Sequence, residues 1–290
     1  MKTLLLIAGL LALLVPTVLA QEAPEAEVEE NPIEEILEVT EAAMVGVGSM
    51  DAELLGDVLL QGGLLVADES PMEEATVMSV EQLLEVMGDA DGMGRETDWT
   101  CDEDDVIVIG DYALATGHVA AEEQDVTVMA CLTRMDGMWK VAAMFGFPGE
   151  LDMGEDAELP EEIDEIIGEL SEGEQTGMQA ALPYLPEESH AFFLVAGPGF
   201  TIPLGGVEAI REQVGEWEDP AEVDTTPVAQ ALVSPTAVVC AFESTFLNGD
   251  VVTHSTNVVA FAMLDGEWRL VSFLSGSVPM VEEENEEENQ

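Results

Sequence analysis

The sequence predicts an α+β protein built from two tandem copies of one unit, each a curved antiparallel sheet with helices on one side. Two observations predict this fold class. First, Met135–Ala143 and Leu264–Ser272 share one pattern: an apolar strand, Asp-Gly, a Trp, a basic residue and a second apolar strand. Asp-Gly between apolar runs favours a type I′ hairpin turn, in which both central residues have positive φ. Second, in each copy patterns of helical period precede patterns of strand period. The Asp-Gly pairs lie 129 residues apart (265 − 136), about the length of one small domain.

The N-terminal residues 1–20 have the pattern of a secretory signal peptide. Lys2 is followed by an apolar run, Leu4–Val15, and by small residues that end at Ala20. The apolar run is too short to span a bilayer comfortably, so we expect cleavage after Ala20 rather than an uncleaved anchor. No Cys follows the cleavage site, which argues against a lipoprotein. We therefore expect a secreted or periplasmic protein that has no membrane contact after cleavage.

The charge balance of the chain is strongly acidic. The 290 residues include 62 acidic and six basic ones, a formal net charge of −56. Such a charge excludes nucleic acid and anionic membrane surfaces as partners. Salt adaptation and cation binding are the two explanations that remain. Acidic residues are spread through both copies and Lys is scarce, so the composition favours salt adaptation and a saline habitat.

The chain has three cysteines, an odd number for an exported protein. Cys101 and Cys131 fall in the same copy and could form a disulfide, but the sequence does not establish that they are close. Cys240 lies in an apolar strand, and we expect it to be a buried free thiol. The spacing of the cysteines matches no zinc motif, and we expect neither a metal nor a cofactor.

The first copy is expected at residues 32–147, after an acidic flexible leader at 21–31. Asn31-Pro32 predicts the start of its first helix, and Ser79 with Gln82 predicts a capping box at the start of its third. A shorter helix at 51–60, which Gly62-Gly63 should end, precedes a small hairpin. The hairpin strands are expected at 64–67 and 76–78, the third helix at 80–87, and the later strands at 106–109, 112–120, 126–134 and 139–147.

The second copy is expected at residues 161–278 and repeats this plan after an acidic linker at 148–160. The tail at 279–290 is acidic and of low complexity, so we expect it to be disordered. Within the second copy we expect helices at 161–182 and 207–217, a small hairpin at 190–202, and strands at 222–232, 237–247, 251–264 and 268–273.

Short motifs occur in the same order in both copies. The second copy carries Gly197–Gly199, Gly206–Arg211 and Asp265–Val271, and the first matches through Gly110–Ala113 and Asp136–Lys140. In order and spacing, they resemble the nuclear transport factor 2-like superfamily and, more narrowly, its SnoaL-like members. The resemblance implies two cone-shaped α+β barrels, each with helices on the concave side of the sheet and a pocket beneath the first helix.

The resemblance leaves the function open, because members of the superfamily include isomerases, cyclases, dehydratases and non-catalytic binding modules. Such domains usually pair through the outer faces of their sheets. The resemblance therefore implies that the two copies of this chain form a pseudo-dimer within one molecule.

The second copy holds the most specific candidate site. If the Asn-Gly pair in Phe246–Val251 forms a two-residue turn, Glu243 lies directly opposite His254, near enough for a hydrogen bond. His254 would then be a general acid or base that Glu243 orients. The alternative is a solvated cross-strand ion pair of little energetic weight. The position of the pair close to the turn favours this second interpretation.

Four further residues are candidates for a ligand pocket. Ala241 and Thr256 share a face of small side chains that leaves room for a helix or a ligand, and Phe193 and Trp217 are bulky apolar residues that could line the pocket.

The leading functional interpretation is a non-catalytic protein that binds a small apolar molecule or a protein partner. The alternatives are an isomerase- or cyclase-like enzyme that uses Glu243 and His254, and a structural envelope protein with filled pockets. A cavity of about 300 Å³ or more, lined by convergent polar groups, would favour binding or catalysis over a structural role.

Overall fold

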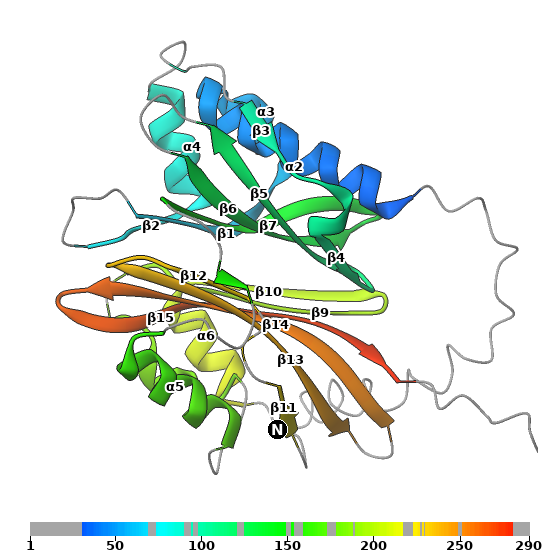
Figure 1. Cartoon of the computed structure of the whole chain (residues 1–290), viewed down its shortest axis with the longest axis vertical. Coiled ribbons are helices and arrows are strands. Elements are labelled where there is room, and N and C mark those ends of the chain that lie inside the picture. Colours follow the sequence, from blue (N-terminus) through cyan, green and yellow to red (C-terminus); the bar gives the residue numbers. More distant parts are fainter. Residues whose placement is uncertain are drawn as a thin grey trace, which may run out of the picture. The chain divides into compact units, whose positions relative to one another are not determined.

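Two mixed β-sheets, one from each copy, form the framework of the computed structural model (Figure 1). The structure describes residues 31–68, 74–89, 94, 98–120, 125–148, 152–153, 159–172, 178–187, 189–216, 223–226, 228, 230–248 and 251–280. The expected signal peptide therefore lies outside the described residues. Residues 33–290 form one compact unit, which holds both copies.

The helices of the first copy are α2 (Pro32–Ser49), α3 (Ala52–Val58) and α4 (Val80–Asp89). Helix α2 begins at Pro32 as expected. The predicted capping box is confirmed: the Ser79 N–H donates to Gln82 Oε1 (2.8 Å), and the Gln82 N–H donates to Ser79 Oγ (3.2 Å). Helix α3 has a cap of its own, because Asp51 Oδ1 accepts the N–H groups of Glu53 and Leu54.

The first sheet has the strand order β2-β1-β7-β6-β5-β3, with β4 also paired to β5. All its pairs are antiparallel except β1 with β7, so the expectation of a wholly antiparallel sheet is wrong. The parallel pair arises because the chain returns after the meander to lay β7 beside β1. The strands are β1 (Leu59–Ala67), β2 (Thr76–Ser79), β3 (Asp98–Thr100), β4 (Val106–Ile109), β5 (Tyr112–Ala120), β6 (Val126–Met135) and β7 (Met138–Pro148).

The sequence led us to expect that Gly62 and Gly63 end a helix. In the structure they lie inside strand β1. The register between β1 and β7 shifts between Leu59 and Leu64. Gly62 has φ +78°, and a Cβ at Gly63 would clash with the carbonyl of Ala142. Glycine is needed here because the strand bends against its neighbour at close range.

The second sheet repeats the order, as β10-β9-β15-β14-β13-β12-β8, with β11 also paired to β13 and with β9 parallel to β15. Strand β8 falls in the expected linker and pairs with β12. The elements of this copy are β8 (Asp152–Met153), α5 (Glu161–Glu172), the 3-10 helix η2 (Leu182–Tyr184), β9 (Phe192–Gly197), β10 (Phe200–Gly205), α6 (Val207–Val214), β11 (Val223–Thr225), β12 (Gln230–Val233), β13 (Ala237–Asn248), β14 (Val251–Leu264) and β15 (Glu267–Pro279).

Details of the backbone repeat from copy to copy. The two Asp-Gly turns have the predicted positive φ values, 53° and 81° at Asp136-Gly137 and 53° and 79° at Asp265-Gly266. The register shifts between Cys131 and Leu132 in β6, and again between Ala260 and Phe261 in β14, at positions 129 apart (260 − 131). A register shift at the same place in both sheets is a specific structural feature. The α+β fold class with two tandem copies is therefore confirmed.

Each sheet has helices on one face and the other sheet on its opposite face (Figure 1). Ile36, Leu55 and Leu83 pack from the helices onto the first sheet. Ile163 and Ile210 do the same on the second. The faces turned away from the helices share one apolar cluster that joins the sheets, and its bulkiest members are Tyr112, Phe145, Phe147 and Phe192. The core therefore consists of three apolar layers. One lies between the first sheet and its helices, one between the two sheets, and one between the second sheet and its helices.

All three cysteines are free thiols. Cys240 is buried and unpaired, as expected. Cys131 is also buried, and burial raises the pKa of both thiols to about 12. The Cys101 thiol donates to the carbonyl of Thr116 (3.1 Å) instead of joining a disulfide. No helix among the described residues is both long and apolar enough to cross a membrane.

Candidate functional site

The predicted register between β13 and β14 is wrong by two residues. The ladder pairs Asn248 with Val251, so Glu243 faces Thr256 and His254 faces Thr245. The predicted and observed registers keep the same side chains on the same face of the sheet. The apolar pattern therefore could not distinguish them, and the preference of Asn-Gly for the turn did not decide the outcome.

Glu243 and His254 are consequently diagonal neighbours on the ladder, a relation in which residues lie about 7–8 Å apart. Glu243 is exposed and His254 is half-buried. Within the described part of the chain no hydrogen bond or ion pair joins them. The corresponding rung of the first copy pairs His118 with Thr127, whose side chains are hydrogen-bonded (Nδ1···Oγ1 3.2 Å). No contact therefore supports an acid–base pair at Glu243 and His254.

Three of the four predicted pocket residues lie among the described residues, and these three do not share one face of the second sheet. Ala241 belongs to the apolar cluster between the two sheets, and Thr256 lies on the same face of the second sheet. Phe193 is buried on the opposite face, among the helices. Trp217 lies outside the described residues. The face of small side chains accommodates the first sheet rather than a helix or a ligand.

The described residues form a cleft where α5, η2 and the start of β15 meet. Its volume is about 440 Å³. Helix α5 contributes side chains at i, i+3, i+4 and i+7, which share one face of a helix. The lining residues are Glu162, Glu165, Ile166, Glu169, Pro183, Tyr184, Glu267, Trp268 and Arg269. We call this site the α5–β15 cleft.

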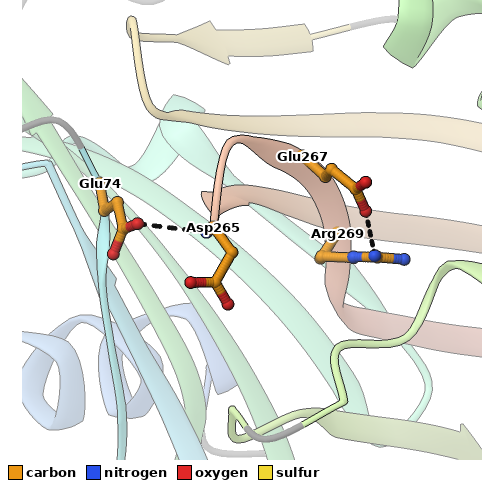
Figure 2. Close-up of polar contacts among 4 residues, drawn as sticks. All are labelled: Glu74, Asp265, Glu267 and Arg269. Atoms are coloured by element: carbon orange, nitrogen blue, oxygen red, sulfur yellow. Dashed lines mark hydrogen bonds and ion pairs between the residues drawn. The ribbon is translucent and has the colours of Figure 1, made fainter.

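The polar groups of the α5–β15 cleft are partly engaged with one another. The Tyr184 hydroxyl donates to the Glu169 carboxylate, and this hydrogen bond is the main reason that the pKa of Tyr184 rises to about 12. Arg269 forms an ion pair with Glu267 (Figure 2), and both side chains are partly exposed. The lining includes no His, Cys, Ser or Lys. The cleft can thus accept hydrogen bonds through its carboxylates, donate them through Arg269 and contact apolar groups.

The corresponding position in the first copy is built differently. Trp139 and Lys140 stand where the second copy has Trp268 and Arg269. The Lys140 ammonium donates to the carbonyl of Asp57 at the end of α3. Helix α3 has seven residues, whereas η2 has three, so the first copy covers this end of its sheet with a longer helix.

A buried polar cluster on the helix side of the second sheet escaped the sequence analysis. The Ser244 and Ser255 hydroxyls lie 2.8 Å apart, and Asn257 Nδ2 donates to Ser244 Oγ (2.9 Å). The first copy has Val119, Val126 and Val128 at these positions. Comparing the two copies residue by residue would have revealed the change. Across the described residues no group of three or more His, Cys, Asp or Glu side chains is placed to hold a metal ion.

No protein-family model matches this chain, and no curated protein matches it either. Several solved structures do match this chain. One is a nuclear transport factor 2-like protein of unknown function from Silicibacter pomeroyi, with 14% identity over 41% of this chain and 96% of that chain (TM-score 0.36). Another, from Shewanella baltica, has 14% identity over 43% and 99% (TM-score 0.36). A putative dehydratase of the same family from Streptomyces avermitilis has 17% identity over 41% and 96% (TM-score 0.33). At these identities and TM-scores the likeness assigns neither a superfamily, nor a ligand, nor a reaction to this chain.

Proposed function

We propose that the chain is a non-catalytic binding protein and that the α5–β15 cleft of its second copy holds a small molecule. The observation that carries this proposal is the cleft itself. Its volume of about 440 Å³ lies within the range of small-molecule sites, and polar groups converge on it from α5, η2 and β15. A structural protein with filled pockets would not need such a site.

The lining restricts the chemistry of the ligand. Four carboxylates, from Glu162, Glu165, Glu169 and Glu267, disfavour an anion. Ile166, Pro183 and Trp268 offer apolar surface. The cleft therefore fits a molecule with an apolar body and a hydrogen-bond donor, which is more polar than the purely apolar ligand expected from the sequence.

Native mass spectrometry with a matched pair of variants tests the proposal. The full chain is mixed with benzylamine, which has an apolar ring and an ammonium group, or with benzoate as its anionic counterpart. Glu165→Trp places a bulky ring in the cleft, and Asp164→Trp places one on the same helix at an exposed residue outside the lining. We expect a benzylamine adduct with the wild type and Asp164→Trp and none with Glu165→Trp. Equal adducts in all three proteins would contradict the proposal.

We also propose that the protein is exported and adapted to salt. The signal-like residues 1–20 and the net charge of −56 support this proposal. N-terminal sequencing of the protein isolated from its source should then begin at Gln21. A mature protein that still carries Lys2 would contradict cleavage.

We further propose that the two copies work as one pseudo-dimer within the chain. The apolar cluster between the sheets supports this, as do the hydrogen bonds from one copy to the other. The Gly199 N–H donates to Asp111 Oδ2 (2.9 Å), and the Thr133 and Thr201 hydroxyls lie 3.1 Å apart.

A further inference from the structure

One residue of the first copy reaches the segment that lines the cleft of the second. Glu74, just before β2, accepts the backbone N–H of Asp265 through its Oε1 (3.1 Å), although the two residues are 191 positions apart in the chain (Figure 2). Asp265 is the first central residue of the type I′ turn between β14 and β15. A carboxylate that accepts a backbone N–H forms a charge-assisted hydrogen bond, which is stronger than a neutral one.

This turn leads directly into the cleft. Glu267, Trp268 and Arg269 are the first three residues of β15, and all three line the α5–β15 cleft. On one side these three residues pair with Leu264, Met263 and Ala262 of β14. On the other side the ladder between β15 and β9 begins only at Ser272. The cleft-lining end of β15 is therefore supported by a neighbouring strand on one side alone.

We infer that Glu74 is a positioning residue for the α5–β15 cleft, so that the binding site of the second copy is complete only in the presence of the first. This inference rests on the proposed function. The hydrogen bond fixes the turn, and the turn fixes where Trp268 and Arg269 stand relative to α5. Glu74 does not line the cleft, so its effect passes through the backbone of the turn.

The chain provides a matched control for Glu74. Asp111 also accepts a backbone N–H from the other copy, that of Gly199, at 2.9 Å. That contact involves the turn between β9 and β10, which does not line the cleft. Asp111→Ala therefore removes a comparable contact between the copies and leaves the β14–β15 turn untouched.

The experiment compares wild type, Glu74→Ala, Glu74→Gln and Asp111→Ala as full chains, by amide hydrogen exchange and by titration with benzylamine. In Glu74→Ala we expect exchange at residues 264–270 to rise about five- to tenfold and benzylamine binding to weaken by a similar factor. Glu74→Gln should recover most of both, because its amide oxygen can accept the same N–H. Exchange at the equivalent turn, residues 135–141, should stay unchanged, and Asp111→Ala should alter neither readout.

The outcomes separate this inference from the proposed function. Unchanged exchange at 264–270 in Glu74→Ala overturns the positioning role, whatever benzylamine does. Faster exchange with unchanged benzylamine binding overturns the link between the turn and the cleft. If the wild type binds no benzylamine, or binds it no better than Glu165→Trp does, the proposed function fails. The exchange data then still decide whether Glu74 holds the turn.

Discussion

At the residue scale, the two copies pack closely where Gly276 meets Tyr112. Gly276 of β15 lies under the ring of Tyr112 from the first copy, and a Cβ there would overlap the ring. The Tyr112 hydroxyl is buried beside the Cys131 thiol, and burial is the main reason that its pKa rises well above the ordinary value. The contact between Tyr112 and Gly276 does not follow from the sequence, because it joins residues that are far apart in the chain.

Gly276→Ala should destabilise the protein by about 1–3 kcal/mol, because the added methyl group displaces the Tyr112 ring in a packed layer. Gly146→Ala on β7 is the control. A Cβ there would meet Val126 and Val128 at ordinary distances of 3.7 and 3.8 Å. Urea unfolding measures both variants, and an equal loss of stability would contradict the packing of Tyr112 on Gly276.

Both tyrosines of the chain should resist ionisation. The pKa of Tyr184 is raised to about 12 by its hydrogen bond to Glu169, and that of Tyr112 is raised by burial. A raised pKa favours folding below the unfolded value of about 10, and that contribution is lost as the pH rises through the folded value. The tyrosinate absorbance of the native protein should therefore stay low at about pH 10. Glu169→Gln should let Tyr184 ionise nearer its ordinary pKa, and a normal titration of both residues in the wild type would contradict these environments.

At the scale of elements, local signals predicted what local residues determine. The Asp-Gly turns have the expected φ values, the Ser79 box caps α4 and Pro32 begins α2. The misassigned features depend on distant partners. Gly62 bends a strand because β7 lies beside it, and the rung that Glu243 occupies is set along the whole of β13 and β14. The cleft could not be predicted because it requires α5, η2 and β15 together.

The buried polar cluster of the second sheet should behave as a unit. Asn257→Val removes the donor to Ser244 and should cost about 1–3 kcal/mol of stability. Replacing Ser244, Ser255 and Asn257 together by Val recreates the apolar surface of the first copy. The triple variant should lose less stability than the sum of the three single variants, as thermal unfolding can determine. Strict additivity would contradict a cooperative network.

At the scale of the whole molecule, the net charge of −56 opposes the compact state by self-repulsion. Salt screens interactions between exposed charges, with a Debye length of about 3 Å at 1 M. The unfolding temperature should therefore rise from dilute buffer to molar sodium chloride. An unchanged unfolding temperature, measured by calorimetry, would contradict salt adaptation.

The whole molecule also unites one copy that carries the cleft with another that supports it. The measurement that tests this account most directly is an NMR titration of the full chain with benzylamine, with amide shifts mapped along the backbone. We predict that the shifts concentrate in α5, η2 and residues 267–269, and that the equivalent residues 138–140 of the first copy do not respond. Shifts centred on Glu243 and His254, or no saturable shifts at all, would contradict the assignment of function to the α5–β15 cleft.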